Sequence, residues 1–432
     1  MRMHVSRFAM AGAVPLLALL AGAPAAGPRD GWDFAFKDFV IAAWNPPGDT
    51  DAEYTYYKKA GFNLVMSVRY TLPDNALDLA RKHGLKVLVD TYTPNDTPWG
   101  GTASEYTAHP SHHPATLPEL EWLFERYGDH PALAGFLLGD DYGALPRELV
   151  ETTGFLREHA PHLLPWVCQN VMSGEGLAKA GNPIMDPQIY PTLYQRDRPA
   201  ADQAQLLCRQ LQQLRAACIE YDLIPWPMVN VHGVHSDSMN RFQVYAALAY
   251  GAQGIWYFTY SFVMSNDMLS LQNGTGYETE DEVAAHLTPI WAIIAGINER
   301  VAVWGPELLG RVPQEVYHTG AWPGFGVPGK GKIVQRMDDD LLVGILTKPG
   351  APPLAMVVDK RVHLEPDALG PRKVSIDFGG DVAGVTVLEK DGINEIQGNS
   401  LALTLPAGGG QLVRLNAGGA AGVGRTAPRP TG

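Results

Sequence analysis

Short apolar runs alternate with amphipathic segments along the first 300 residues of the chain. The apolar runs are too short for helices and end at Gly, Pro, Asn or Asp, which is typical of buried strands. Strands are predicted at 39–44, 63–68, 85–90, 133–139, 164–170, 184–190, 226–231 and 254–260. Helices are predicted at 54–60, 73–83, 117–127, 146–159, 201–221, 241–250 and 288–300.

The alternation of strands and helices favours parallel strands. Eight such units within residues 30–304 fit a (β/α)8 barrel, which typically has about 250 residues. An open doubly wound sheet is the competing fold. It usually has fewer units and often a Gly-rich phosphate loop, and the sequence contains no such loop. The predicted fold class is therefore α/β, a (β/α)8 TIM barrel.

The pattern changes after about residue 305. Short apolar segments separated by Gly, Pro and Asp predict strands at 341–346, 354–358, 372–378, 385–388, 401–405 and 411–415. Such spacing is typical of an antiparallel β-sandwich, which we expect over residues 305–416. Residues 417–432 are rich in Gly, Ala and Pro, and we expect them to be disordered.

Residues 1–26 resemble a secretory signal peptide. Arg2, His4 and Arg7 give a basic start, residues 8–20 are apolar, and Ala23-Pro24-Ala25 resembles a cleavage site. The apolar run is short for a membrane span, so an uncleaved anchor is the less favoured alternative. We expect a secreted or periplasmic protein with no membrane attachment after cleavage.

Composition excludes several classes of function. The net charge is -13 and no Lys/Arg-rich run occurs, which argues against a nucleic-acid or anionic-membrane partner. Three cysteines are too few for a disulfide framework. His232 and His235, like the histidines at 109–113, lack the helical His-Glu-x-x-His pattern, so no metal is predicted. We expect no cofactor and a monomer.

Barrel enzymes place their sites where the carboxyl ends of the strands meet the following loops. Carboxylates, amides and aromatic rings at these ends fit a sugar, which needs hydrogen bonds, ring stacking and two carboxyl groups at the scissile bond. The candidate catalytic residues are Asp141 and Asp186. The candidate substrate-binding residues are Trp44, Tyr70, Asp90, Asp140, Asn170, Tyr190, His232, Trp256 and Tyr260.

Strand alternation separates the two adjacent aspartates after residue 139. Asp141 shares parity with Leu137 and two glycines, whereas Asp140 shares parity with Phe136 and Leu138. The bulkier set is expected to face the helices. This predicts that Asp141 faces the barrel interior and that Asp140 is a supporting group.

Five stretches, at 44–46, 60–64, 139–141, 186–191 and 250–258, resemble secreted bacterial glycoside hydrolases of the clan A barrel type. The resemblance covers roughly residues 38–300, and it implies a barrel followed by a β-sandwich. It also implies a Glu acid/base after the fourth strand and a Glu nucleophile after the seventh. This chain departs at both places, because Asp141 follows the fourth strand and Asn230-Val231-His232 ends the seventh.

Three hypotheses follow for the chemistry. In the first, Asp141 and Asp186 are the catalytic pair, which resembles barrel glycosidases with an Asp nucleophile on the fourth strand and an acid two strands on. In the second, Asp141 acts with Glu175 or Asp237. In the third, the chain is an inactive secreted carbohydrate-binding barrel. The first two predict a secreted glycoside hydrolase that cleaves a poly- or oligosaccharide, with carbohydrate as its partner.

Overall fold

The computed structural model describes residues 27–67, 74–91, 116–141, 146–170, 172–262, 266–270, 276–320, 322–366 and 368–417. Three expectations lie outside the described residues: the signal peptide, the disordered tail beyond residue 417, and the position of Tyr70.

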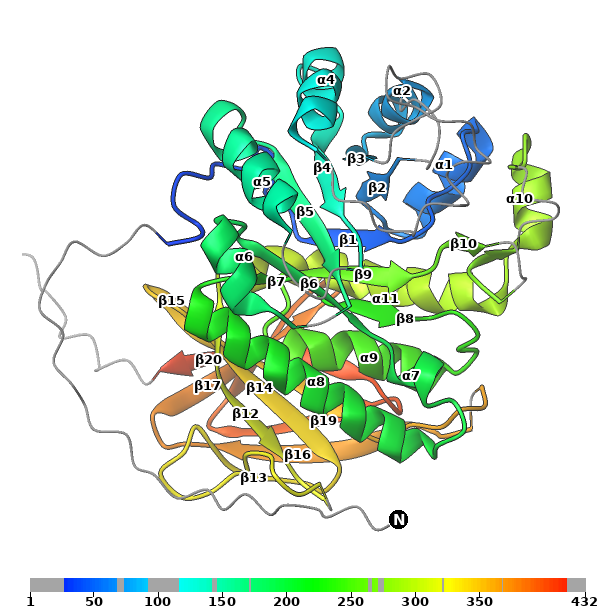
Figure 1. The fold of residues 1–432 in the computed structure, drawn as a ribbon. Helices are drawn as coiled ribbons and strands as arrows, with labels where there is room; N and C mark the ends of the chain where they lie inside the picture. The colour runs from blue at the N-terminus through cyan, green and yellow to red at the C-terminus, as the bar shows by residue number, and fades with distance from the viewer. Residues whose placement is uncertain are drawn as a thin grey trace, which may run out of the picture.

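Eight parallel strands of the described chain form the predicted closed barrel (Figure 1). The strands are β1 (Val40–Ala43), β2 (Leu64–Met66), β3 (Lys86–Asp90), β4 (Leu133–Gly139), β5 (Leu164–Gln169), β6 (Ile184–Ile189), β8 (Met228–Asn230) and β9 (Gly254–Phe258). The ring closes because β1 pairs with β9 and β5 pairs with β6. The two-residue strand β7 (Ile224–Pro225) pairs only at the start of β6. The predicted seventh strand is thus β8, with β7 before it.

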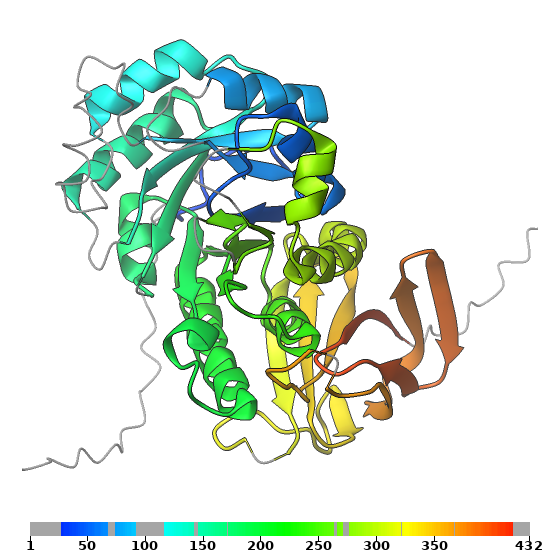
Figure 2. The same ribbon diagram turned by 90° about the vertical axis from the view of Figure 1, so that its right-hand side faces the viewer.

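Helices surround the barrel (Figures 1 and 2). They are α1 (Asp51–Lys59), α2 (Asp74–His83), α4 (Leu117–Tyr127), α5 (Arg147–His159), α6 (Gly174–Ala180), α7 (Pro191–Tyr194), α8 (Ala200–Tyr221), α9 (Asp237–Ala249), α10 (Glu280–His286) and α11 (Pro289–Leu308). Helix α9 begins earlier than predicted because the Ser236 side chain caps it by accepting from the Met239 N–H. Helix α11 continues past residue 304, where we expected the barrel domain to end. Within the described residues, no helix has the length and apolar character needed to span a bilayer.

Two apolar layers hold the barrel together. The inner layer fills the ring, and at its centre the indoles of Trp166 and Trp256 stack with centroids 3.9 Å apart. The outer layer lies between strands and helices and includes Phe136 and Leu138 of β4. The three cysteines are buried, free thiols.

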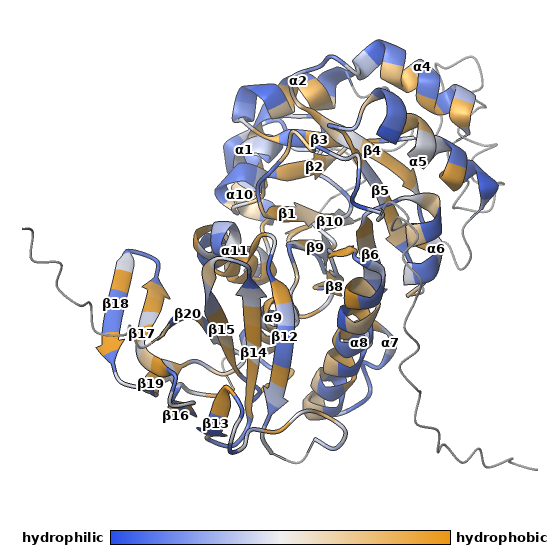
Figure 3. Ribbon diagram, turned by 90° about the vertical axis from the view of Figure 1, so that its left-hand side faces the viewer, coloured by the Kyte–Doolittle hydropathy of each residue, from blue (hydrophilic) through white to orange (hydrophobic). Residues whose placement is uncertain are grey.

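Two antiparallel sheets follow the barrel, as predicted (Figure 3). The larger sheet has the order β12 (Val312–His318), β14 (Leu341–Lys348), β15 (Ala351–Asp359), β20 (Gly410–Ala417), β17 (Val382–Glu389) and β18 (Gly392–Gln397). The smaller has the order β13 (Val334–Met337), β16 (Arg372–Phe378) and β19 (Ser400–Leu405). A third apolar cluster lies between the two sheets. Strands β12, β13 and β18 were not predicted from the sequence.

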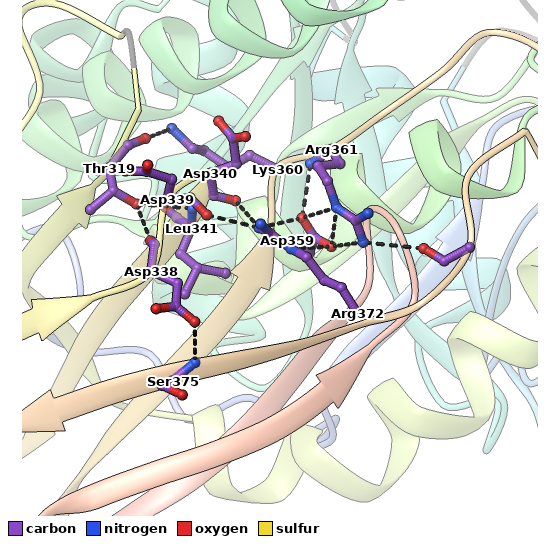
Figure 4. Close-up of polar contacts among 11 residues, drawn as sticks. Thr319, Asp338, Asp339, Asp340, Leu341, Asp359, Lys360, Arg361, Arg372 and Ser375 are labelled. Carbon is purple, nitrogen blue, oxygen red and sulfur yellow. Dashed lines mark hydrogen bonds and ion pairs between the residues drawn. The ribbon is translucent and has the colours of Figure 1, made fainter.

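A buried carboxylate ties the loops at one end of the sandwich together (Figure 4). The Asp359 side chain has no exposed surface and accepts hydrogen bonds from both Arg361 and Arg372. Arg372 also donates to the backbone carbonyls of Asp339 and Asp340. The strand ends around this carboxylate are therefore fixed by charged hydrogen bonds.

Candidate active site

A bulge at the end of β4 decides which way its two aspartates point. The register with β5 shifts between Leu137, which is opposite Trp166, and Gly139, which is opposite Val167. Trp166 belongs to the inner apolar layer and Val167 to the outer one, so the shift reverses the alternation of β4 beyond Leu137.

Asp140 therefore lies on the interior side of the barrel. Its carboxylate is within electrostatic range of Cys168, Asp186 and Tyr190, and the residue is 4% exposed. The parity argument, which turned Asp140 towards the helices, is wrong because it assumed an unbroken alternation. Gly139 was the available signal, since a glycine inside a strand often marks a bulge.

Asp141 stands at the rim with a partly exposed side chain. Its backbone adopts a left-handed conformation, φ 61°, and its N–H donates to the carbonyl of Cys168 at 3.1 Å. The side-chain amide of Gln188 donates to the Asp141 carboxylate. This contact joins the ends of β4 and β6, so both strands position one accessible carboxylate.

Asp186 lies deeper, inside the barrel wall, with no exposed surface. Its Oδ2 accepts from the indole Nε1 of Trp166 at 2.6 Å, and its Oδ1 has no hydrogen-bond partner among the described residues. Burial raises the pKa of Asp186 well above its usual value, the Trp166 hydrogen bond opposes that shift, and the Asp140 charge adds to it. Burial therefore disfavours the charged form of the Asp186 carboxyl.

An exposed aromatic ring accompanies these carboxyls at the rim. Tyr194, at the end of α7, is 69% exposed, and the Asp141 charge contributes, after burial, to raising its pKa. The Tyr190 ring lies 6.0 Å from the Tyr194 ring, and the Tyr190 hydroxyl donates to the Met228 sulfur at 2.7 Å. Tyr194 was not among the predicted binding residues. Its exposure could not be read from the sequence.

A histidine–aspartate pair occupies the end of β8, where the expected carboxylate is missing. The Nδ1 of His232 lies 2.8 Å from Oδ1 of Asp267, whose side chain has no exposed surface. The Thr259 hydroxyl donates to the same oxygen, and burial raises the pKa of Asp267. Asp267 thus fixes the His232 ring, which is 24% exposed.

The other predicted binding residues lie at different depths in the barrel. Trp44 and Asp90 are buried near the barrel interior, and Asn170 is exposed after β5. Trp256 lies within the inner layer, stacked on Trp166. Tyr260 belongs to the outer layer, where its ring meets Tyr57 edge-on at 4.9 Å, so it lies away from the barrel interior.

The two alternative partners for Asp141 lie on helices. Glu175, in the first turn of α6, pairs with Lys179 at 2.7 Å on an exposed face, and this pairing lowers the pKa of Glu175. Asp237, in the first turn of α9, lies 3.5 Å from Arg241. Throughout the described part of the chain, no three His, Cys, Asp or Glu side chains group as a metal site would require.

Comparisons with known proteins identify the fold. No model of a protein family matches the chain, and no curated protein is similar to it. A solved structure named only as a glycoside hydrolase has a TM-score of 0.51 and 12% identity, covering 90% of this chain and 97% of that one. A β-L-arabinopyranosidase from Geobacillus stearothermophilus has a TM-score of 0.48 and 10% identity, covering 92% and 99%.

An α-amylase from Anoxybacillus is also similar, with a TM-score of 0.46 and 12% identity, covering 85% of this chain and 90% of that one. Of these three, the structure with a TM-score of 0.51, named as a glycoside hydrolase, shares the overall fold of this chain. At these identities the likeness concerns the fold alone, and the site must be argued from its own residues.

Proposed function

We propose that this chain is an exported glycoside hydrolase that cleaves a poly- or oligosaccharide without a cofactor. One observation carries the proposal: the partly exposed Asp141 carboxylate lies within electrostatic range of the exposed Tyr194 side chain at the carboxyl-end rim of a closed barrel. A carboxylate beside an aromatic platform is the arrangement that a sugar ring and its glycosidic bond require.

The roles follow from burial. Asp141, held by Gln188, is the group that attacks the anomeric carbon or activates water. Asp186 is the protonated carboxyl. Since Asp186 is fully buried, it needs an intermediate group to pass its proton to the leaving oxygen, and Asp140, with which it interacts electrostatically, is the candidate for that group.

The remaining polar groups at the strand ends orient the sugar. His232, fixed by Asp267, offers its second ring nitrogen to a hydroxyl, and the exposed Asn170 amide is a second hydrogen-bonding group. Tyr194 supplies the face on which a sugar ring stacks.

A second candidate function is carbohydrate binding without catalysis. The burial of Asp186 and the absence of a carboxylate from residues 228–232, at the end of β8, favour this alternative. In that case the rim residues bind sugar and no bond is cleaved.

Hydrolysis of a panel of aryl glycosides and polysaccharides tests the proposal. We expect activity in the parent chain and a loss of at least about 100-fold in Asp141→Asn. Asp140→Asn tests the group proposed to pass on the proton, and Asp186→Asn tests the carboxyl proposed to supply it. Glu175→Gln and Asp237→Asn test the alternative catalytic partners of Asp141. Full activity in Asp141→Asn contradicts the catalytic assignment, and sugar binding without hydrolysis in the parent favours the second function.

Export is tested by the mass of the mature protein. Cleavage near residue 26 and recovery from the periplasm or medium are expected, because residues 1–26 have the three parts of a signal peptide. Recovery of the full-length chain from the cytoplasm contradicts this part of the proposal.

A further inference from the structure

A cavity of about 310 Å³ lies outside the barrel, where α9 and α11 face the C-terminal sheets. Figure 3 shows these two helices between the barrel and the strands β17, β19 and β20. The helix wall contributes Arg241, Tyr245 and Arg300, and the strand wall includes Glu389 and Asn394. Its size is at the lower end of the range for small-molecule sites, about 300–1,000 Å³.

Two guanidinium groups on the helix wall are incompletely engaged. Arg300 forms no ion pair with a described residue, and its Nη1 reaches the side-chain oxygen of Gln411 only at 3.5 Å. Arg241 donates from Nε to the carbonyl of Ala407 at 3.0 Å, and its Nη1 lies 3.5 Å from Asp237. Donors on both side chains are thus available to a ligand.

Tyr245 adds an independent indication of a ligand. The residue is 3% exposed and lines the cavity, yet its hydroxyl has no hydrogen-bond partner in the described ranges. Buried tyrosine hydroxyls usually find a partner. Burial raises the pKa of Tyr245 to about 12, while the charges of Arg300 and Arg241 oppose the shift, so both guanidinium groups act on this hydroxyl.

The charges of the lining define the class of ligand. Arg241 already has the Asp237 carboxylate at 3.5 Å, so Arg300 is the arginine left to pair with a ligand, which suits a monoanion better than a polyanion. The planar guanidinium matches the two oxygens of a carboxylate. Tyr245, Asn394 and Glu389 offer hydrogen bonds to hydroxyl groups.

We propose that this cavity binds a carboxylate-bearing sugar residue of the uronic-acid class, at a site separate from the barrel rim. The site holds one part of an acidic saccharide while the residues at the barrel rim act on another part of the same saccharide. Binding here requires no catalysis, so the proposal stands or falls independently of the roles given to Asp141 and Asp186.

Calorimetric titration of the full chain with D-galacturonate and D-galactose tests the site. We expect galacturonate to bind at least about tenfold more tightly than galactose, because only the acid pairs with the arginines. Arg300→Gln is expected to weaken galacturonate binding about tenfold, and Tyr245→Phe about fivefold. Arg336→Gln, an exposed arginine on β13 that pairs with Asp377, is the matched control.

Three results of these titrations would contradict the proposed site. Equal binding of acid and neutral sugar, no binding of either, or unchanged binding in folded Arg300→Gln and Tyr245→Phe overturns the proposal. Unchanged binding in both variants would mean that the acid binds outside this cavity. Thermal unfolding of each variant verifies that its fold is retained.

Discussion

Trp166 donates its indole N–H to the carboxyl of Asp186 at 2.6 Å inside the barrel, where neither side chain has exposed surface. The same indole stacks on Trp256. The hydrogen bond therefore connects the aromatic centre of the barrel to the carboxyl that we propose as a proton source.

Replacing Asp186 tests both its packing and its charge. Asp186→Asn keeps an acceptor for the indole, so we expect a folded protein, whereas Asp186→Ala leaves the N–H unpaired and costs about 1–3 kcal/mol. Because the folded-state pKa of Asp186 is raised, the wild-type carboxyl contributes most stability below pH 3.8 and loses it as pH rises.

Denaturant unfolding at pH 4 and pH 8 measures this effect. The free energy of unfolding of Asp186→Asn, relative to the parent, is expected to rise between the two pH values. Parallel pH dependence in the two proteins would show that Asp186 ionises normally.

The left-handed backbone of Asp141 gives a second prediction. Asn tolerates this conformation, so Asp141→Asn removes the charge with little loss of stability. Asp141→Ala is expected to cost about 1 kcal/mol more, because alanine adopts a left-handed conformation less readily. Thermal unfolding of the two variants measures the difference. Equal stabilities would mean that the φ of 61° imposes no strain.

The barrel was predictable because its strands are continuous apolar runs, each followed by a helix-length segment. Its chemistry was less predictable, because the bulge before Gly139 reverses the direction of Asp140 without changing the apolar pattern. The His232–Asp267 pair joins residues 35 positions apart, which no local pattern indicates. Strand β18 is almost wholly exposed and so lacks the alternation that reveals a strand.

Acid sensitivity is predicted from His318 at the contact between the barrel helices and the sandwich. His318 is 2% exposed, and its Nε2 lies 2.9 Å from the hydroxyl of Tyr250. Burial, with the charge of Lys360, lowers the pKa of His318 to about 3. Its contribution to stability is thus present above pH 6.5, the usual histidine value, and is lost as pH falls towards 3.

Replacement of His318 should reduce the loss of unfolding free energy as the pH falls. Between pH 7 and pH 4 we expect His318→Gln to lose about 2 kcal/mol less than the parent, a value reduced from the full shift for partial solvation. His159→Gln, on an exposed helix end, is the control and should follow the parent. Equal acid sensitivity in all three proteins would contradict the role of His318.

The Asp359 carboxylate in Figure 4 yields the last prediction. Asp359→Asn removes the charge that both Arg361 and Arg372 bind, and it leaves two cations together in a largely buried place. Removing one partner of a buried ion pair costs about 3–5 kcal/mol, and we expect about 3 kcal/mol because the arginines are partly exposed.

Asp377→Asn is the matched control, since Asp377 pairs with Arg336, whose side chain is 79% exposed. Exposed pairs contribute less than about 1 kcal/mol, so this variant should unfold at nearly the parent denaturant concentration. Asp359→Asn should unfold earlier, and added salt should recover part of the loss by screening the two arginines. Equal destabilisation by both substitutions would mean that burial of Asp359 adds nothing to its ion pairs.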